Sequence, residues 1–392
     1  MDVDIRIYRG PRGLIELGDL WQGLVEDMAE RNLVHTYEWH RSFMESLEPH
    51  PEAALFVGVW LAGSLEAILP LRPARPLGRF GRRGLEVPTN PHVPYTDFVV
   101  SDPARLRAAM PAVLRRLAAE PDVPWDYLAL RRTRRESCAE WCLRDLPGFT
   151  IRSTPAGLAD FLSVQSQDAL FGYLTSHFRN NLRRAHKRAE ALGGISYHTA
   201  RDRQECEALF QEFQAVEASG WKGEEGTRSA IALDAGLRSF YTMLMRRFSD
   251  RGQCRIDVVR HDSRPIAAAF QLVVDGTIYG LKIGFDESHA QIAPGNLLHW
   301  HIFRSACDDP QLSTYDMTSD AAWHAQWKPS AVELIDIVVV RPGLRGAIAD
   351  VEERTRERAN HWRQRFVRRW IVTERGRRRL VWRRGPAREA RR

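Results

Sequence analysis

The chain has 392 residues, of which 44% are hydrophobic, and its formal net charge is +7. This length exceeds what one hydrophobic core usually supports, so we expect two domains. Apolar runs stay far below the roughly 20 residues that span a bilayer, so no transmembrane helix is predicted.

The positive charge is concentrated at the end of the sequence. Residues 346–392 contain sixteen arginines, no lysine and six acids, a net charge of +10, and the remaining residues carry a net charge of −3. The folded part therefore lacks the cationic excess needed to track a nucleic-acid backbone, and no specific DNA binding is expected.

The five cysteines and the first residues indicate the compartment. The cysteines are scattered without metal-ligand spacing, so we expect free thiols and no metal. Residues 1–6 are charged and alternating, without the apolar stretch of a secretory signal. We predict a cytoplasmic protein.

The first half alternates between helical and strand patterns. Periodicity and turn signals predict two helices, a hairpin, an edge strand, a capped helix and a further strand. Their ranges are 14–47 for the two helices, 53–61 and 65–71 for the hairpin, then 91–100, 104–119 and 125–130. Residues 144–165 contain Pro155 and Gly157 and break the periodicity, so we expect at most a short strand there and a domain junction.

The second half begins with a helix and continues as a mixed pattern. The expected elements are a helix at 167–192, a strand at 195–199, helices at 203–218 and 237–249, strands at 254–259, 265–274 and 277–283, and a helix at 294–306. Gly193 is expected to end the first of these helices. Asp275-Gly276 predicts a tight hairpin between the last two strands.

Short motifs follow one another through the second half in a recognisable order. They are Arg179 to Arg184, Gly220-Trp221, Arg264 to Ala268, Tyr279 to Asp286, Pro294 to Leu298, Asp316 and Trp327-Lys328. In this order they resemble the CelD-like acyltransferases of the GNAT superfamily, named for a cellulose-biosynthesis protein. They are similar, more distantly, to the Fem-type aminoacyltransferases, which are two GNAT folds in tandem.

The resemblance implies an α/β (α+β) fold of two tandem GNAT-like domains, with mixed, partly antiparallel sheets flanked by helices. We place an N-terminal GNAT-like domain at 1–155, a C-terminal GNAT acyltransferase domain at 156–345 and a basic Arg/Trp-rich tail at 346–392.

The resemblance also implies a site for an acyl-CoA donor, with acetyl-CoA as one candidate. In GNAT enzymes a helix N-terminus meets the donor pyrophosphate, because unpaired amides and the helix dipole favour anions there. Pro294, Gly295, Asn296 and Leu297 hold that position here. A capped core helix is the alternative.

Three residues are candidates for catalysis. Lys328 stands where the related families carry a Tyr-Lys pair, and its ammonium could offset negative charge on a phosphate or an oxyanion. Asp286 and Asp316 each end a strand, and either could take the proton from the attacking group. The alternatives are a surface lysine and two turn-capping carboxylates.

A basic helix face is the candidate acceptor site. Arg179 and Arg183 lie four residues apart and share a face, where like charges repel, so an anionic partner is a reasonable cause of this arrangement. In the Fem-type relatives this helix contributes to holding the acceptor's phosphates, and we add Trp221 to the substrate-binding residues. A solvated cationic face is the alternative.

The tail at 347–392 interleaves arginines with tryptophans, a pattern that suits an anionic membrane surface. Single-stranded RNA and a solvated helix are the alternatives. We expect peripheral contact with the inner face of the membrane.

Taken together with these patterns, the resemblance implies a transferase that moves an acyl group from a CoA or carrier thioester to an amine or hydroxyl. The acceptor would contain a saccharide or be lipid-linked, in envelope polysaccharide synthesis. One alternative is a non-catalytic scaffold, favoured because the sequence lacks the usual GNAT phosphate loop and because Asp316 and Lys328 are widely spaced. The other is an aminoacyl-tRNA-dependent transferase, although tRNA is the less favoured partner.

Overall fold

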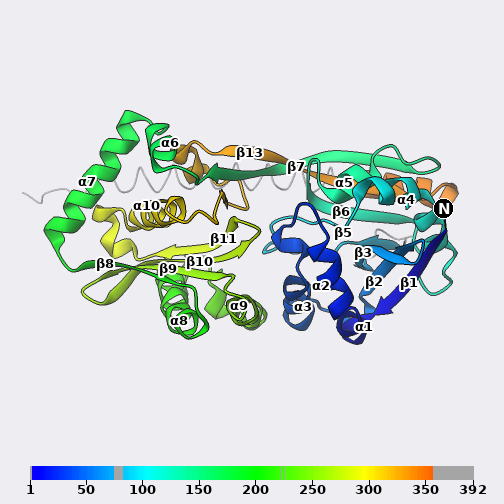
Figure 1. Cartoon of the computed structure of the whole chain (residues 1–392), viewed down its shortest axis with the longest axis horizontal. Helices are drawn as coiled ribbons and strands as arrows, with labels where there is room; N and C mark the ends of the chain where they lie inside the picture. The colour runs from blue at the N-terminus through cyan, green and yellow to red at the C-terminus, as the bar shows by residue number, and fades with distance from the viewer. Residues whose placement is uncertain (1, 75–82, 221, 225, 356–392) are drawn as a thin grey trace, which may run out of the picture.

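The computed structural model describes residues 2–74, 83–220, 222–224 and 226–355. Within this part, one mixed sheet of thirteen strands runs through the molecule in the order β1-β2-β3-β4-β6-β13-β7-β12-β11-β10-β9-β8, with β5 paired to β3. Helices cover both of its faces (Figure 1). The sequence-based expectation of an α/β fold with a mixed, partly antiparallel sheet is confirmed.

The first half supplies one end of the sheet. Its strands are β1 (Val3–Arg9), β2 (Leu55–Leu61), β3 (Ser64–Pro73), β4 (Gly84–Glu86), β5 (Val99–Val100) and β6 (Tyr127–Arg134). Its helices are α1 (Gly10–Glu16), α2 (Gly18–Glu26), α3 (Tyr37–Ser46), α4 (Pro103–Ala119) and α5 (Cys138–Leu143). The predicted hairpin at 53–71 and the Asp102-capped helix are both present, since the Asp102 carboxylate accepts from two first-turn amides of α4.

The second half supplies the other end. Its strands are β8 (Ile195–Ala200), β9 (Cys254–His261), β10 (Arg264–Val274), β11 (Thr277–Phe285) and β12 (Thr314–Asp316). Its helices are α6 (Gln167–Gly172), α7 (Ser176–Leu192), α8 (Arg203–Ser219), α9 (Ala235–Ser249) and α10 (Pro294–Cys307). The Asp275-Gly276 turn is confirmed, with positive φ at both residues as such a hairpin requires.

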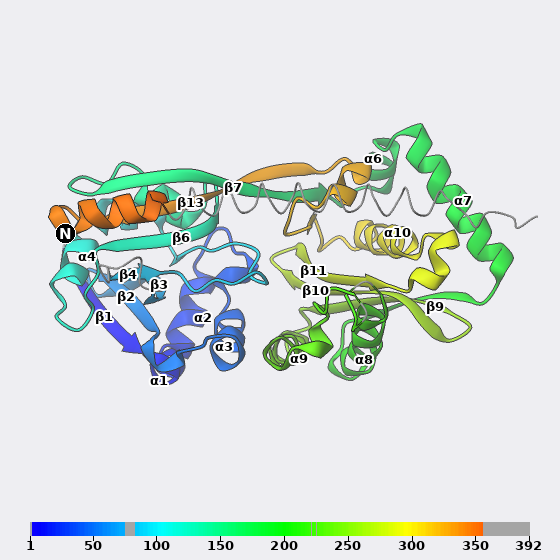
Figure 2. The same ribbon diagram turned by 180° about the vertical axis from the view of Figure 1, so that it is seen from behind.

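Two long strands belong to both halves. β13 (Ser330–Val340) pairs antiparallel along its whole length with β7 (Thr150–Ser163), and Figures 1 and 2 show the two strands side by side, running from one half into the other. β13 also pairs with β6, while the end of β7 pairs with β12. The expected junction at residue 155 therefore falls inside a strand.

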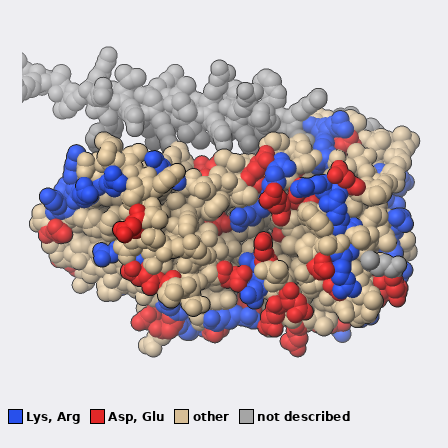
Figure 3. All heavy atoms as spheres, turned by 45° about the horizontal axis from the view of Figure 1, so that its top comes forward, with Lys and Arg blue, Asp and Glu red and all other residues tan. Residues whose placement is uncertain are grey.

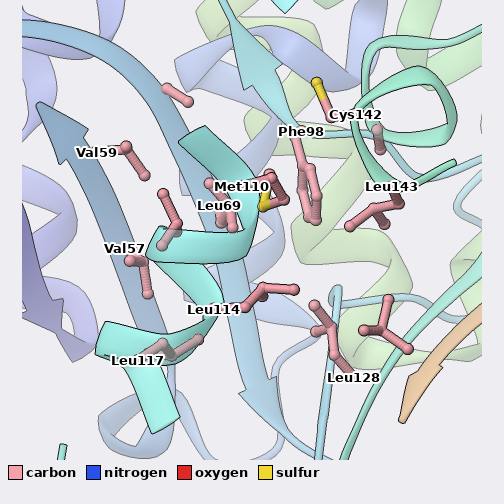
Figure 4. Close-up of a cluster of buried hydrophobic side chains, with 14 of the residues drawn as sticks. Val57, Val59, Leu69, Phe98, Met110, Leu114, Leu117, Leu128, Cys142 and Leu143 are labelled. Carbon is pink, nitrogen blue, oxygen red and sulfur yellow. The ribbon is translucent and has the colours of Figure 1, made fainter. Parts of the chain in front are cut away.

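The core is divided among several clusters on the two faces of the sheet. In the first half, Met110, Leu114 and Leu117 of α4 pack on side chains of β2, β3 and β6 (Figure 4). In the second half, α7 and α10 cover one face and α8 and α9 the other. Trp39 of α3 packs edge-on against Phe240 of α9, with ring centroids 5.3 Å apart, so apolar packing also joins the halves.

Three predicted elements differ from the structure. Residues 144–165 hold a fourteen-residue strand rather than a short one, because a register shift next to Pro155 absorbs the irregularity without ending the pairing. The predicted helix at 167–192 is two helices, α6 and α7, and Thr175 caps the second through its hydroxyl. The predicted strand at 91–100 is reduced to Val99–Val100.

No helix among the described residues is long and apolar enough to cross a membrane. The predicted membrane-binding tail lies beyond residue 355 for most of its length and so falls outside the described residues.

Candidate functional site

Strands β11 and β12 diverge in the middle of the second half. They pair in parallel only from Thr277↔Thr314 to Tyr279↔Asp316. β11 then continues to Phe285 while the chain after Asp316 turns away at Thr318, whose φ is +58°. A cavity of about 190 Å³ lies at the divergence.

The N-terminus of α10 borders a second cavity of about 360 Å³. Gly295 and Asn296 of α10 face Gly284 and Phe285 of β11 across it. The two cavities share Lys222, Ile283, His299 and Trp323 in their walls, and we call them together the channel. A narrow passage between parting strands thus ends at the positive end of a helix dipole.

The start of α10 follows from its local sequence. Ala293 adopts a left-handed conformation, and Pro294 then occupies the first turn, where its missing N–H carries no penalty. The side-chain amide of Gln326 donates to the Asn296 side-chain oxygen at 3.1 Å. This hydrogen bond holds the two residues together in the wall of the cavity that they both line. Of the four predicted donor residues, Gly295 and Asn296 line the channel, whereas Pro294 and Leu297 are buried in the core.

A buried carboxylate and a lysine lie beside the channel. The Lys222 ammonium donates to Glu217 at 3.2 Å and to the Ile283 carbonyl at 2.8 Å. Glu217 is only 2% exposed and accepts the Ile231 amide at 2.7 Å through its other oxygen. Gly284 permits this arrangement, because a Cβ there would stand 2.6 Å from the Glu217 Cα.

Two histidines, His299 and His324, contribute to the channel walls. His299 donates to the Gly295 carbonyl at 2.9 Å, and burial lowers the pKa of His299 to about 4, so its ring is neutral at physiological pH. His324 is buried, and its Nδ1 lies 2.8 Å from the Asp160 carboxylate. Trp323 packs between the two rings.

The two predicted catalytic carboxylates lie outside the channel walls. Asp316 is 2% exposed and forms an ion pair with Arg134 at 3.0 Å, and burial raises the pKa of Asp316 although Arg134 opposes that effect. Asp286 accepts the Ser288 amide and so caps a short 3₁₀ helix. Burial works against ionisation of Asp286, but the Ser288 hydrogen bonds and the charges of His289 and Arg264 lower its pKa overall.

Lys328 lies on the side of α6 and α7. Its ammonium stands 5.3 Å from the centre of the exposed Tyr173 ring, directly after α6. Arg179 contacts the same turn, since its guanidinium donates to the Gly172 carbonyl at 2.8 Å. The structure thus brings Lys328 and Arg179 to one turn, and Lys328 is not part of the channel walls.

A third cavity, of about 780 Å³, lies between α6, α7 and α10, and we call it the basic cavity. Arg179, Arg183 and Lys187 line it from α7 and Arg304 from α10, with Asp168 and Glu190 as the acids. Figure 3 shows basic side chains gathered at the end of the molecule where α7 lies. Trp221, predicted to bind substrate, lies outside the described residues.

The sequence reasoning missed Glu217, Lys222 and Lys282. The rarity of lysine could have pointed to Lys222 and Lys282. The chain has 53 arginines but only four lysines, at 187, 222, 282 and 328. Three of the four line a cavity described here, and the fourth contacts the α6–α7 turn.

The described residues contain no group of three or more histidines, cysteines, aspartates or glutamates that could hold a metal ion. The channel combines a helix N-terminus, where free amides and the helix dipole favour an anion, with ionisable groups in its walls.

Comparisons with known proteins address the same region. Residues 176–328 match the model of the acetyltransferase (GNAT) domain. No curated protein matches the chain significantly.

Solved structures share the fold at low sequence identity. A crystal structure of FemX has a TM-score of 0.57 and 11% identity, covering 85% of this chain and 98% of that one. A protein of unknown function from Bacteroides thetaiotaomicron has a TM-score of 0.51 and 12% identity, covering 83% and 97%. The C-terminal domain of a putative lysylphosphatidylglycerol synthetase from Agrobacterium fabrum has a TM-score of 0.50 and 12% identity, covering 86% and 96%.

These likenesses extend over both halves, and they concern the fold alone. The matched residues include α7, the diverging strands and the start of α10, and they end at Lys328. Residues 176–328 are therefore similar to an acetyltransferase (GNAT) domain.

Proposed function

We propose that the chain is a GNAT-type acyltransferase that moves an acyl group from a CoA or carrier thioester to an amine or hydroxyl. The acceptor contains a saccharide or is lipid-linked, as in envelope polysaccharide synthesis. The observation that carries this proposal is the divergence of β11 from β12 beside the N-terminus of α10.

The placement of the cavities supports different roles for the two halves. Residues 156–345 carry the donor site, and residues 1–155 contribute to the acceptor side. Donor phosphates would lie at Gly295 and Asn296, and the thioester arm would pass between the strands toward Lys282 and His299. Catalysis by positioning suits such a passage, because direct attack on a thioester needs no covalent enzyme intermediate.

The basic cavity supports a site for anionic groups of the acceptor. Arg179, Arg183 and Arg304 supply guanidinium groups, which bind phosphates and carboxylates in a bidentate manner. Lys328 would add charge at the α6–α7 turn. Proton removal by Asp286 or Asp316 stays a prediction, and the ion pair of Asp316 and the capping role of Asp286 give it little support.

The donor site can be tested by a change of charge. Asn296→Asp keeps the size of the side chain but adds a negative charge where phosphates would bind. We expect the affinity for acetyl-CoA and longer acyl-CoA thioesters to fall at least about tenfold by isothermal titration calorimetry, the equivalent of about 1.4 kcal/mol.

Gln311→Glu is the matched control, because Gln311 is exposed in the loop after α10 and lines none of the cavities described here. Its affinity should stay within about twofold of wild type. Equal affinity in the Asn296→Asp variant would contradict the donor site, and no binding of any acyl-CoA by the wild type would favour the scaffold alternative.

The basic cavity also keeps an aminoacyl-tRNA donor as a second candidate, since a cationic cleft beside a transferase site suits an RNA end. Transfer activity that survives nuclease treatment of the extract would exclude it.

A further inference from the structure

Lys282 lies where the channel meets a separate cavity between the two halves. That cavity has a volume of about 380 Å³, and we call it the inter-half cavity. Residues 90–94 and Arg132 line it from the first half, and Tyr241 and Lys282 from the second. Leu281, Lys282, Thr318 and Ser319 belong to the walls of both this cavity and the channel.

The strand geometry explains this position. Lys282 follows Tyr279, the last residue of β11 that pairs with β12, so its strand has already left its neighbour. On the opposite edge β11 stays paired with β10, where Lys282 faces Phe270, so the backbone holds the side chain in place.

The surroundings of Lys282 come from several elements. Lys222 and Glu217 stand behind it, at the end of α8, and the Tyr241 ring of α9 has its centre 5.8 Å from the ammonium. His92 and Arg132 face the inter-half cavity from the first half. Across the channel the ionisable groups are His299, Tyr315 and His324.

These surroundings make the Lys282 ammonium easier to deprotonate than an ordinary lysine. Burial and then the charge of Lys222 lower the pKa of Lys282 to about 8, against the opposing effect of Glu217. An arginine at this position could not lose its proton in the same way, because a guanidinium stays protonated at any physiological pH. The chain uses arginine at 53 of its 57 basic positions and lysine at this one.

The inter-half cavity has the polarity of a binding site for a polar molecule. Among the described residues, its walls contain Arg132 and no aspartate or glutamate. His92 Nδ1 is buried and has no hydrogen-bond partner among the described residues, and burial, followed by the charge of Lys282, lowers the pKa of His92 to about 4. A neutral imidazole, a guanidinium and an amine suit an acceptor that bears an anionic group beside its reacting amine or hydroxyl.

We propose that the inter-half cavity receives the reacting group of the acceptor, apart from any anionic groups that the basic cavity would hold, and that the Lys282 amine removes the proton from the attacking nitrogen or oxygen. The inference rests on the proposed acyl transfer. The acceptor atom forms a bond to the thioester carbonyl carbon as its proton passes to Lys282. The tetrahedral intermediate then expels the thiolate by breaking the C–S bond, and the Lys282 ammonium returns the proton to sulfur, so the products are the acylated acceptor and a free thiol.

The first test measures the pH at which the Lys282 amine loses its proton, and it needs no acceptor. The full chain is labelled with acetic anhydride at a series of pH values, and acetylation of each of the four lysines is followed by peptide mass spectrometry. Lys282 should titrate near pH 8. A Lys282 titration near 10.5 would overturn the proposal.

A second labelling uses acetyl-CoA as the probe. A neutral amine beside a bound thioester should be acetylated faster than Lys187 and Lys328, with a rate that rises through pH 8. Anhydride titration near pH 8 without preferential labelling by acetyl-CoA would count against CoA as donor, a failure of the proposed function rather than of the neutral amine.

The kinetic test uses acetyl-CoA with glucosamine 6-phosphate, a probe that carries an amine, hydroxyls and an anionic group. Lys282→Arg and Lys282→Gln should each lower kcat about 10²-fold or more, with the KM for acetyl-CoA within twofold of wild type. The alkaline rise of kcat/KM near pH 8 should vanish in both. Wild-type kcat in Lys282→Arg would refute the assignment, and if the wild type is inactive on this probe the anhydride titration decides.

Discussion

At the scale of single residues, Arg255 and Asp257 form a fully buried ion pair on β9. The guanidinium donates to the two carboxylate oxygens at 2.7 and 3.0 Å, and both residues are 0% exposed. Gln271 and Thr199 also donate to Asp257. Most polar atoms of the pair thus have hydrogen-bond partners, as buried charges require.

We predict that Asp257→Ala lowers the free energy of unfolding by about 3–5 kcal/mol, because it leaves the Arg255 charge buried without a partner. Urea unfolding measures this cost. The double change Arg255→Met with Asp257→Leu should recover most of the loss, and a single-variant cost below about 1 kcal/mol would contradict the argument.

Burial raises the pKa of Asp257, but the Arg255 charge and the hydrogen bonds from His301 and Arg255 outweigh this and lower it below 3.8. A depressed carboxylate pKa stabilises the fold above the unfolded value. This contribution should therefore be complete above about pH 5 and lost as the pH falls below that value.

Lys282 has the opposite effect on stability. Its folded pKa of about 8 lies below the ordinary 10.5, so the unfolded chain binds more protons between those values and wild-type stability rises with pH there. Lys282→Met should stabilise the protein at pH 7 by about 1–2 kcal/mol after allowance for solvent screening, and the gain should shrink toward pH 10.5. Thermal unfolding at the two pH values measures it.

Lys328→Met is the matched control for that experiment, because Lys328 is exposed and has no buried charge to relieve. Its free energy of unfolding should stay within about 0.5 kcal/mol of wild type, as is usual for an exposed side chain. A pH-independent effect of Lys282→Met would show that the amine is fully solvated.

At the scale of elements, the contact between α8 and β11 sets the width of the channel. We predict that Gly284→Ala costs about 1–3 kcal/mol and weakens acyl-CoA binding, since its Cβ would stand 2.6 Å from the Glu217 Cα and push α8 away. Denaturant unfolding and calorimetric titration measure both effects.

Gly23→Ala in α2 is the control, because its Cβ would meet no atom within 4 Å. It should stabilise the protein by about 0.5–1 kcal/mol, the usual gain from replacing a helical glycine. Equal behaviour of the two variants would contradict the close packing of α8 on β11.

The elements also show what could be read from the sequence. The helices α4, α8, α9 and α10 were predictable because their apolar spacing and caps are local. β7 was not, since pairing with β13, almost two hundred residues away, sustains it through Pro155 and Gly157. In the same way the start of α10 was found from Pro294, but Glu217, Lys222 and Lys282 meet only once α8 lies on β11.

At the scale of the whole molecule, the shared strands predict cooperative unfolding. β13 pairs with β6 and β7 in the first half, and β7 reaches β12 in the second, so neither half can lose its sheet alone. We expect a single calorimetric transition whose calorimetric and van't Hoff enthalpies agree. Two resolved transitions would show that the halves are independent.

The place of β13 in the chain has a consequence for biosynthesis. A ribosome releases residues 127–163 long before residues 330–340. During that time β6 and β7 lack β13, the strand that pairs with both of them. Unpaired strand edges invite association with other nascent chains. Ribosome-bound intermediates shorter than about 340 residues should accordingly depend on chaperones for solubility, and that dependence should cease once the last strand has emerged.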